Sequence, residues 1–283
     1  VDQLIAAGKE EFVIELNMEG EVKQLNLLTT GLESLEKELA NFYSMIEENR
    51  FTYGPMLQKD LEQQGFDLAR YSKGLRLTGD DLQIFLTRQI NLTGEANLDM
   101  LSDIEKFSFA LADATDGNAI TIAQTTAKVM KDISRFGNKT VEEASRISAA
   151  LNQAGVSFEQ IGGMVGKFQG FDSAAGAVSN LTAVFGVHMD SMEMMMLANE
   201  DQEEFMHRMR DTFIEQGVAV EDMNLAQKRV LSEQLGMDIP SVEQFFREGA
   251  IDPDMLEEAT ATADAEDAAK RLNKEIQGLI ESE

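Results

Sequence analysis

The sequence predicts an all-α protein, with an N-terminal heptad coiled-coil helix followed by a cluster of short helices joined by glycine turns. Proline occurs only three times in 283 residues, so little interrupts helical segments. Leu, Ala, Met, Glu and Gln, which favour helices, are abundant. Between residues 118 and 250, four glycines close successive helical segments: Gly137, Gly155, Gly217 and Gly236. We therefore expect more than about two-thirds helix and little sheet.

The clearest periodicity lies near the N-terminus, where apolar residues alternate at spacings of three and four: Leu25, Leu28, Leu32, Leu35, Leu39, Phe42 and Ile46. This seam fits one helix packed on its own domain, or a coiled coil between copies of the chain. Leucine at both core positions does not fix the number of strands. Gly54 and Pro55 end the segment. The nearby "EFVIELNM" at 11–18 is the only short strand candidate.

Sequence pattern divides the chain into four segments: an N-terminal segment with the coiled-coil helix (1–54), a helical connector (55–117), a multi-helix module (118–250) and an acidic C-terminal helix (251–283). In the connector, helices are expected at 56–73, stopped by Gly74, and at 97–112. From Asp254 onward, the Ala-rich acidic stretch predicts one or two exposed helices.

Three hydroxyl side chains precede expected helices and favour N-capping. Thr140 stands before "VEE" and Ser157 before "FEQ", with acidic residues in the first turn. Thr78 precedes "GDDLQIFLTRQI" in the same way.

The net charge of −27 restricts the partners. Duplex nucleic acid and anionic membranes both attract basic surfaces, so we expect no specific nucleic-acid partner. The chain has no cysteine, which excludes thiolate chemistry and disulfides. No run of about 18 apolar residues predicts an ordinary membrane span.

Seven of the sixteen methionines fall between residues 189 and 209. Three interpretations compete: a core packed from several helices, an adaptable partner groove and a metal-binding tract. Spacing places two sets on helix faces, namely Met189, Met192 and Met196, then Met206, Met209 and Phe213. Core packing is favoured, so Met192, Met196, Met206 and Met209 are expected to lie buried between helices or between subunits.

Catalytic and metal-binding groups are scarce. His188 and His207 are the only histidines, and 19 residues separate them without any thiolate, so no metal site is expected. There is no G-x-S-x-G sequence and no glycine-rich phosphate loop. "DATDGNAITIAQ" at 113–124 fails as a calcium loop because Ala123 stands where a bidentate Glu is needed. We expect neither an enzyme nor a cofactor.

The sequence "NLAQKRVLSEQLGMDIPSVEQFF" at 224–246 is similar in pattern to a helix-turn-helix. Ala226, Val230 and Leu235 would form its core, Gly236 the turn, and 241–246 the recognition helix. That helix offers Glu243 and no arginine before Arg247, whereas base edges are read by Arg, Lys, Asn or Gln. A plain helical hairpin is the favoured interpretation.

Small residues recur every four positions at Gly162, Gly166, Gly170 and Ala174. On one helix, this spacing would produce a smooth face that lets another backbone approach closely. Close helix packing and transient membrane insertion of 162–186 are the two interpretations.

Two long stretches resemble the recurring helical modules of tailed-bacteriophage tape measure proteins: "EEASRISAALNQAGVSFEQIGGMVGKF" (142–168) and "FGVHMDSMEMMMLANEDQEEFMHRMRDTFIEQGVAVEDMNLAQKRVLSEQLGMD" (185–238). "FLTRQINLTGEANLDML" (85–101) adds to the likeness, which covers roughly residues 80–250. Members of that family are usually much longer, so the resemblance implies a fragment or a short version.

The resemblance implies a virion structural protein that sets tail length, scaffolds tail assembly and leaves at DNA ejection. It also implies several copies, expected as a trimer, in the tail tube lumen or tip after assembly in the host cytoplasm. Tail tube and baseplate or tip proteins would be partners, and a host membrane a transient contact. A helical signalling or assembly scaffold and a DNA-binding regulator are the alternatives.

Overall fold

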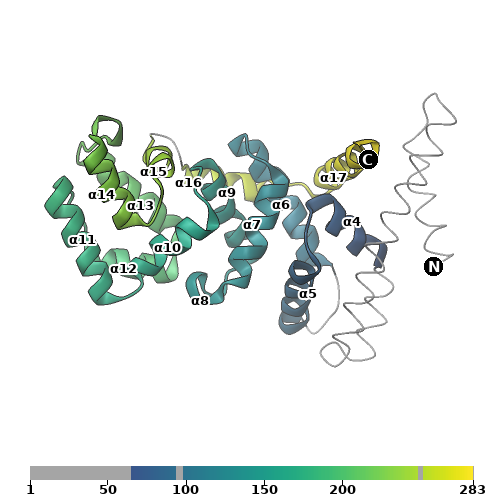
Figure 1. Cartoon of the computed structure of the whole chain (residues 1–283). Coiled ribbons are helices and arrows are strands. Elements are labelled where there is room, and N and C mark those ends of the chain that lie inside the picture. Colours follow the sequence, from purple (N-terminus) through teal and green to yellow (C-terminus); the bar gives the residue numbers. More distant parts are fainter. Residues whose placement is uncertain (1–64, 94–97, 248–250, 283) are drawn as a thin grey trace. The chain divides into compact units, whose positions relative to one another are not determined.

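A computed structural model describes residues 65–93, 98–247 and 251–282, and both the heptad seam and the strand candidate at 11–18 lie outside the described residues. Within these ranges, 80% of the residues lie in fourteen α-helices and none lies in a strand, so the all-α prediction is confirmed there. The helices, drawn in Figure 1, are α4 (Gly65–Leu75), α5 (Gly79–Thr93), α6 (Asp99–Thr115), α7 (Ala119–Lys131), α8 (Ile133–Phe136), α9 (Val141–Gln153), α10 (Phe158–Phe168), α11 (Phe171–Phe185), α12 (Ser191–Glu200), α13 (Gln202–Glu215), α14 (Leu225–Leu235), α15 (Ile239–Phe245), α16 (Pro253–Ala261) and α17 (Ala265–Ser282), with a 3-10 turn at Val220–Asp222.

The chain folds as two compact units. The first contains α4, α5, the start of α6 and α17, and the second runs from Lys106 to Asp264. The second unit therefore contains more of the chain than the expected 118–250 module. The expected C-terminal helix 251–283 is two helices: α16 packs on α9 in the second unit, and α17 packs on α4 in the first.

Helix starts follow the expected capping residues. Thr140 and Ser157 each form a full capping box, in which the hydroxyl accepts from the third helical N–H and that residue's side chain accepts from the cap's N–H. Thr78 and Asp81 exchange the same pair of bonds before α5, at 2.9 and 3.2 Å. Asn224 forms a further capping box at α14. These bonds satisfy N–H groups that a helix start otherwise leaves unpaired.

Helix ends follow the expected glycines. Gly137, Gly155, Gly217 and Gly236 all have φ between +62° and +73°. At Gly236 the left-handed conformation lets its N–H donate to the Ser232 carbonyl at 2.8 Å, which closes α14.

Gly74 does not stop a helix as predicted. It lies inside α4, which ends at Leu75, and Arg76 takes the positive φ of +51°. A Cβ at Gly74 would lie 2.3 Å from Cδ1 of Leu272 and 3.2 Å from Cδ1 of Ile276, both on α17. Leu272 and Ile276 are almost fully buried. The glycine is therefore needed for the close approach of α17 to α4.

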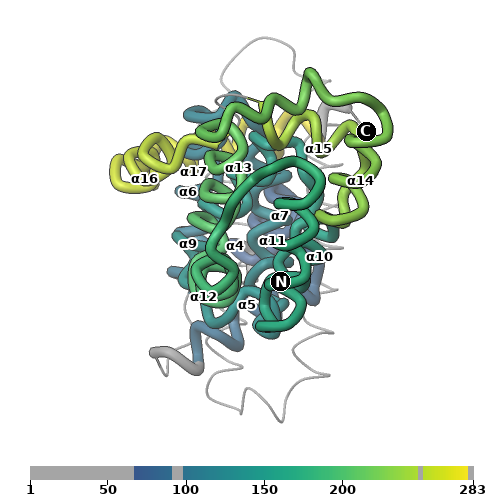
Figure 2. The backbone as a smooth tube through the Cα atoms, turned by 90° about the vertical axis from the view of Figure 1, so that its left-hand side faces the viewer, coloured from purple at the N-terminus to yellow at the C-terminus, as the bar shows by residue number. Residues whose placement is uncertain are grey.

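Short helices of the second unit meet around small side chains and aromatic rings. Between α7 and α9, the buried Thr126 hydroxyl lies 3.4 Å from that of Ser145 and 3.2 Å from that of Ser148. Phe168 packs on Phe205 with ring centroids 5.3 Å apart. In Figure 1, α11 to α14 gather on one side of this unit and α7 and α9 lie on the other, and Figure 2 looks onto the side of α11 to α14.

We predict that Gly74→Ala destabilises the first unit. The added methyl would push Leu272 off its packed position at a cost of about 1–3 kcal/mol, which exceeds the gain of about 1 kcal/mol in helix propensity. Gly278→Ala is the matched control, because Gly278 lies on α17 with nothing within 4 Å of its added Cβ. Chemical denaturation should show Gly74→Ala less stable and Gly278→Ala equal or more stable. Equal behaviour of the two variants would contradict the close crossing.

Candidate functional site

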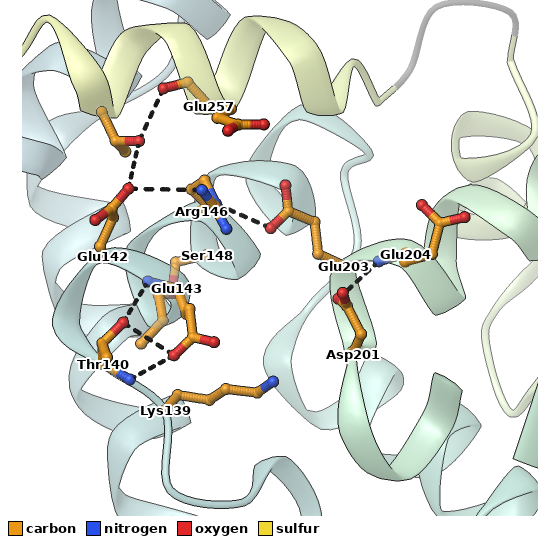
Figure 3. Close-up of polar contacts among 12 residues, drawn as sticks. Lys139, Thr140, Glu142, Glu143, Arg146, Ser148, Asp201, Glu203, Glu204 and Glu257 are labelled. Carbon is orange, nitrogen blue, oxygen red and sulfur yellow. Dashed lines mark hydrogen bonds and ion pairs between the residues drawn. The ribbon is translucent and has the colours of Figure 1, made fainter. Parts of the chain in front are cut away.

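A charged junction centred on Arg146 joins α9, α13 and α16 (Figure 3). The Nε of Arg146 donates to Oε2 of Glu203 on α13 at 3.1 Å, and its Nη1 lies 3.5 Å from Oε1 of Glu142. The Thr260 hydroxyl on α16 donates to the same Glu142 oxygen at 3.0 Å. The side chains of Arg146 and Glu203 are only 22% and 13% exposed, so this pair is mostly screened from water, whereas Glu142 is 46% exposed.

Local sequence explains how these charges are held. The capping box of Thr140 and Glu143 forms the first turn of α9, which contains Glu142, and Glu142 then lies one turn from Arg146 on the same face. Asp201 caps α13 by accepting from the N–H of Glu204 at 3.1 Å, which fixes the turn that carries Glu203 (Figure 3). The Glu142–Arg146 spacing was visible in the sequence. Glu203 is 57 residues away from Arg146, so no local pattern pointed to it.

Burial raises the pKa of the Glu203 carboxyl, while Arg146 opposes the rise and Asp201 and Glu257 add to it. Arg146 therefore counteracts, without cancelling, the cost of placing this carboxylate inside the protein. The junction holds one arginine between two carboxylates, one of which also accepts a hydrogen bond from the Thr260 hydroxyl. These contacts join three helices.

The histidines stay apart in the described part of the chain. His207 lies between Glu204 and Asp211, with Nε2 3.1 Å from Oδ2 of Asp211. His188 exchanges two backbone hydrogen bonds with the side chain of Gln216, each at 2.8 Å. Within the described ranges, no three His, Cys, Asp or Glu side chains gather in a way that could hold a metal ion.

The methionine cluster separates into core and surface. Met206 and Met209 on α13 are fully buried, as predicted, and so is Phe213. Met192 and Met196 are 45% and 51% exposed, so the expectation that they are buried between helices of this chain is wrong, and their burial between subunits stays a prediction.

The reason lies in the rotation of α12, which turns Met194 and Ala198 inward and leaves Met192 and Met196 on the opposite side. We call this outward side the methionine face. Met189, which precedes α12, is half-buried. All three members of the other set, Met206, Met209 and Phe213 on α13, reach the core because the apolar stripe there does face inward.

The expected smooth glycine face is not formed on one helix. Gly162 and Gly166 lie on α10, which ends at Phe168, whereas Gly170 caps α11 and Ala174 lies within it. A Cβ at Gly162 would meet Nη1 of Arg135 at 2.7 Å, but a Cβ at Gly166 would meet nothing within 4 Å. The break at 169–170 therefore divides the spacing between two helices. No helix in the described ranges is long and apolar enough to cross a membrane.

The hairpin of α14 and α15 differs from the expected helix-turn-helix in its core. Leu231 and Leu235 are buried on α14, but Ala226 is exposed and Val230 is half-buried. The second helix starts at Ile239, because Asp238 caps it by accepting from the Ser241 N–H at 2.8 Å.

The charges of this hairpin do not favour DNA. Nζ of Lys228 lies 2.7 Å from Oε1 of Glu243, so an acidic side chain of the second helix engages the cation of the first. Backbone and side-chain hydrogen bonds from Ser241 lower the pKa of Asp238 at the start of that second helix. Duplex binding would bring phosphates towards these carboxylates.

Comparisons with protein-family models, with curated proteins and with solved structures found no match to the chain.

We predict that burying a carboxylate at position 203 makes stability pH-dependent. Because the folded-state pKa of Glu203 is raised, the folded protein binds more protons, and the stability contributed by this group falls as pH rises from its ordinary value of 4.5 through the raised value. Glu203→Gln has no titrating group, so its unfolding free energy should decline less steeply with pH. Urea denaturation at several pH values measures this slope.

Glu204→Gln is the control for that experiment. It removes one negative charge from the next position of the same helix, where the side chain is 43% exposed. If both variants flatten the slope equally, the effect comes from net charge and the Glu203 interpretation fails.

We also predict a sharp contrast within the methionine cluster. Met206→Ala should cost about 2–5 kcal/mol because it opens a cavity in the core. Met196→Ala, which removes an exposed side chain, should change stability by no more than about 0.5 kcal/mol. In the native protein, peroxide should oxidise Met192 and Met196 before Met206 and Met209, as peptide mass spectrometry can measure. Uniform oxidation would contradict the division into core and surface.

Proposed function

We propose that the chain is a structural protein of assembly, and specifically a tape measure protein of a bacteriophage tail. In this role it sets tail length, scaffolds polymerisation of the tail tube and leaves when DNA is ejected. It would be present in several copies in the tube lumen or tip, where it contacts tail tube and baseplate or tip proteins. The trimer that the resemblance implies, with the heptad seam at 25–46 as its contact, remains part of this proposal.

The observation that carries the assembly role is the methionine face. A rigid helix holds two large apolar side chains about half exposed, on a chain whose net charge is −27. Contiguous exposed apolar side chains mark surfaces that contact other molecules, and we take the methionine face as such a surface for another protein. Phe171 on the neighbouring α11 is also 58% exposed.

The tail assignment itself is supported by the sequence resemblance over roughly residues 80–250. The regular alternation of capped starts and glycine ends in the second unit is consistent with the repeated helical modules that the resemblance implies. The acidic charge is consistent with a lumen component that must not adhere to the DNA passing through the tube. If the tail assignment fails, a helical assembly scaffold is the remaining alternative.

A duplication tests the ruler function. Residues 106–264 form one compact unit, so an in-frame second copy of this segment tests whether tail length follows chain length. A ruler with this insertion should give longer tails, by at most about 240 Å if every added residue were helical. Electron microscopy of negatively stained particles measures the length.

Particles of the unmodified strain supply the control. Virions purified from the unmodified strain should contain peptides of this chain, and their tail lengths set the baseline. Intact particles whose tails keep the original length after duplication would contradict the ruler function. Absence of the protein from purified particles would contradict the virion assignment altogether.

A further inference from the structure

The methionine face belongs to a helix that is held firmly at both ends. Asp190 caps α12 by accepting from the N–H groups of Met192 and Glu193, at 2.8 and 3.2 Å. At the other end, the Asn199 side chain donates to the Gln169 carbonyl at 3.1 Å. Met194 and Ala198 anchor the inner side with 1% and 0% exposure. The outer side chains are therefore presented by a fixed backbone.

The fold does not require methionine at the two outer positions. Glutamine, glutamate and lysine favour helices about as well and remain hydrated on a surface. Met192 and Met196 stand one turn apart, which is the spacing at which two helical side chains act as one apolar contact. Methionine is flexible and polarisable, so such a pair adapts to the side chains of a partner helix.

The charge around the methionine face indicates what kind of partner can bind there. From residue 168 to residue 206 the chain has no lysine or arginine, but it has seven carboxylates: Asp172, Asp190, Glu193, Glu200, Asp201, Glu203 and Glu204.

Lysine and arginine side chains from outside residues 168–206 neutralise the negative charge of this stretch only in part. Arg208 lies 2.9 Å from Glu193, Arg146 pairs with Glu203 at 3.1 Å, and Lys139 donates to the Glu200 carbonyl at 2.6 Å. The surroundings of the methionine face therefore remain acidic. A second copy of this chain would bring the same negative charge to the contact, whereas a cationic partner gains attraction and faster association.

We propose that the methionine face docks a basic amphipathic helix of a partner protein. Apolar side chains of that helix, spaced by three or four residues, would cover Met192 and Met196. Its lysines or arginines would lie near the exposed carboxylates of Glu200 and Asp172. This inference does not depend on the tail assignment, since any basic amphipathic helix of suitable spacing meets the same chemistry.

The probe is a synthetic peptide of about four helical turns, built only from leucine and lysine with the leucines on one face. A second peptide has the same composition in scrambled order, so it keeps the charge and loses the apolar face. Isothermal titration with the full chain should show the amphipathic peptide binding at least roughly tenfold more tightly than the scrambled one.

Two variants locate the contact. Met192→Gln combined with Met196→Gln keeps helix propensity and charge, and should abolish the difference between the two peptides. Leu225→Gln is the matched control, because Leu225 is an exposed apolar residue on α14, at 58%, and this variant should keep the difference. Circular dichroism of both variants verifies that they remain helical.

Several outcomes would overturn the proposal. Equal binding of the two peptides would mean that attraction to the acidic chain alone explains the affinity. Unchanged binding by the double methionine variant would place the contact elsewhere. A dimer in sedimentation equilibrium that dissociates in the same double variant would show that a second copy covers the face.

Discussion

The structure depends above all on how its many helix ends are satisfied. Each short helix leaves backbone N–H groups unpaired at its start, and a chain with fourteen described helices meets this requirement repeatedly. Side chains accept those N–H groups at nine starts in the second unit, from Asn118, Asp132, Thr140, Ser157, Asp190, Asp201, Asn224, Asp238 and Asp252. Five of the nine are aspartates, so part of the acidic composition has a structural use. These caps fix where each of the nine helices begins, and so how long each helix is that the core has to pack.

This dependence explains what the sequence could predict. The roles of Thr140 and Ser157 as helix caps and of Gly236 as a helix end could be predicted, because capping depends only on residues a few positions apart. Gly74 was misassigned because its role comes from Leu272, almost two hundred residues later. The spacing of Gly162, Gly166 and Gly170 looked continuous, yet one turn at 169–170 places them on different helices.

Two features reverse the usual placement of charged side chains outside and apolar side chains inside. Glu203 is a carboxylate placed inside, and the methionine face is apolar surface placed outside. The first is tolerated because Arg146 comes from another helix to meet it. Periodicity could locate the methionines on helix faces, but it could not say which face turns inward, since that depends on the packing of α10, α11 and α13 around α12.

The absence of lysine and arginine from residues 168–206 also determines how proteolysis and chemical cross-linking can probe the methionine face. Trypsin cleaves after those two residues, so it releases everything from Phe168 to Arg208 as a single peptide. Reagents that join lysine to lysine find no amine on α11 or α12 in the chain itself. Coupling of carboxylates to amines, by contrast, has abundant acidic sites there. Any cross-link that such coupling forms on these two helices must draw its amine from another segment or from a bound partner.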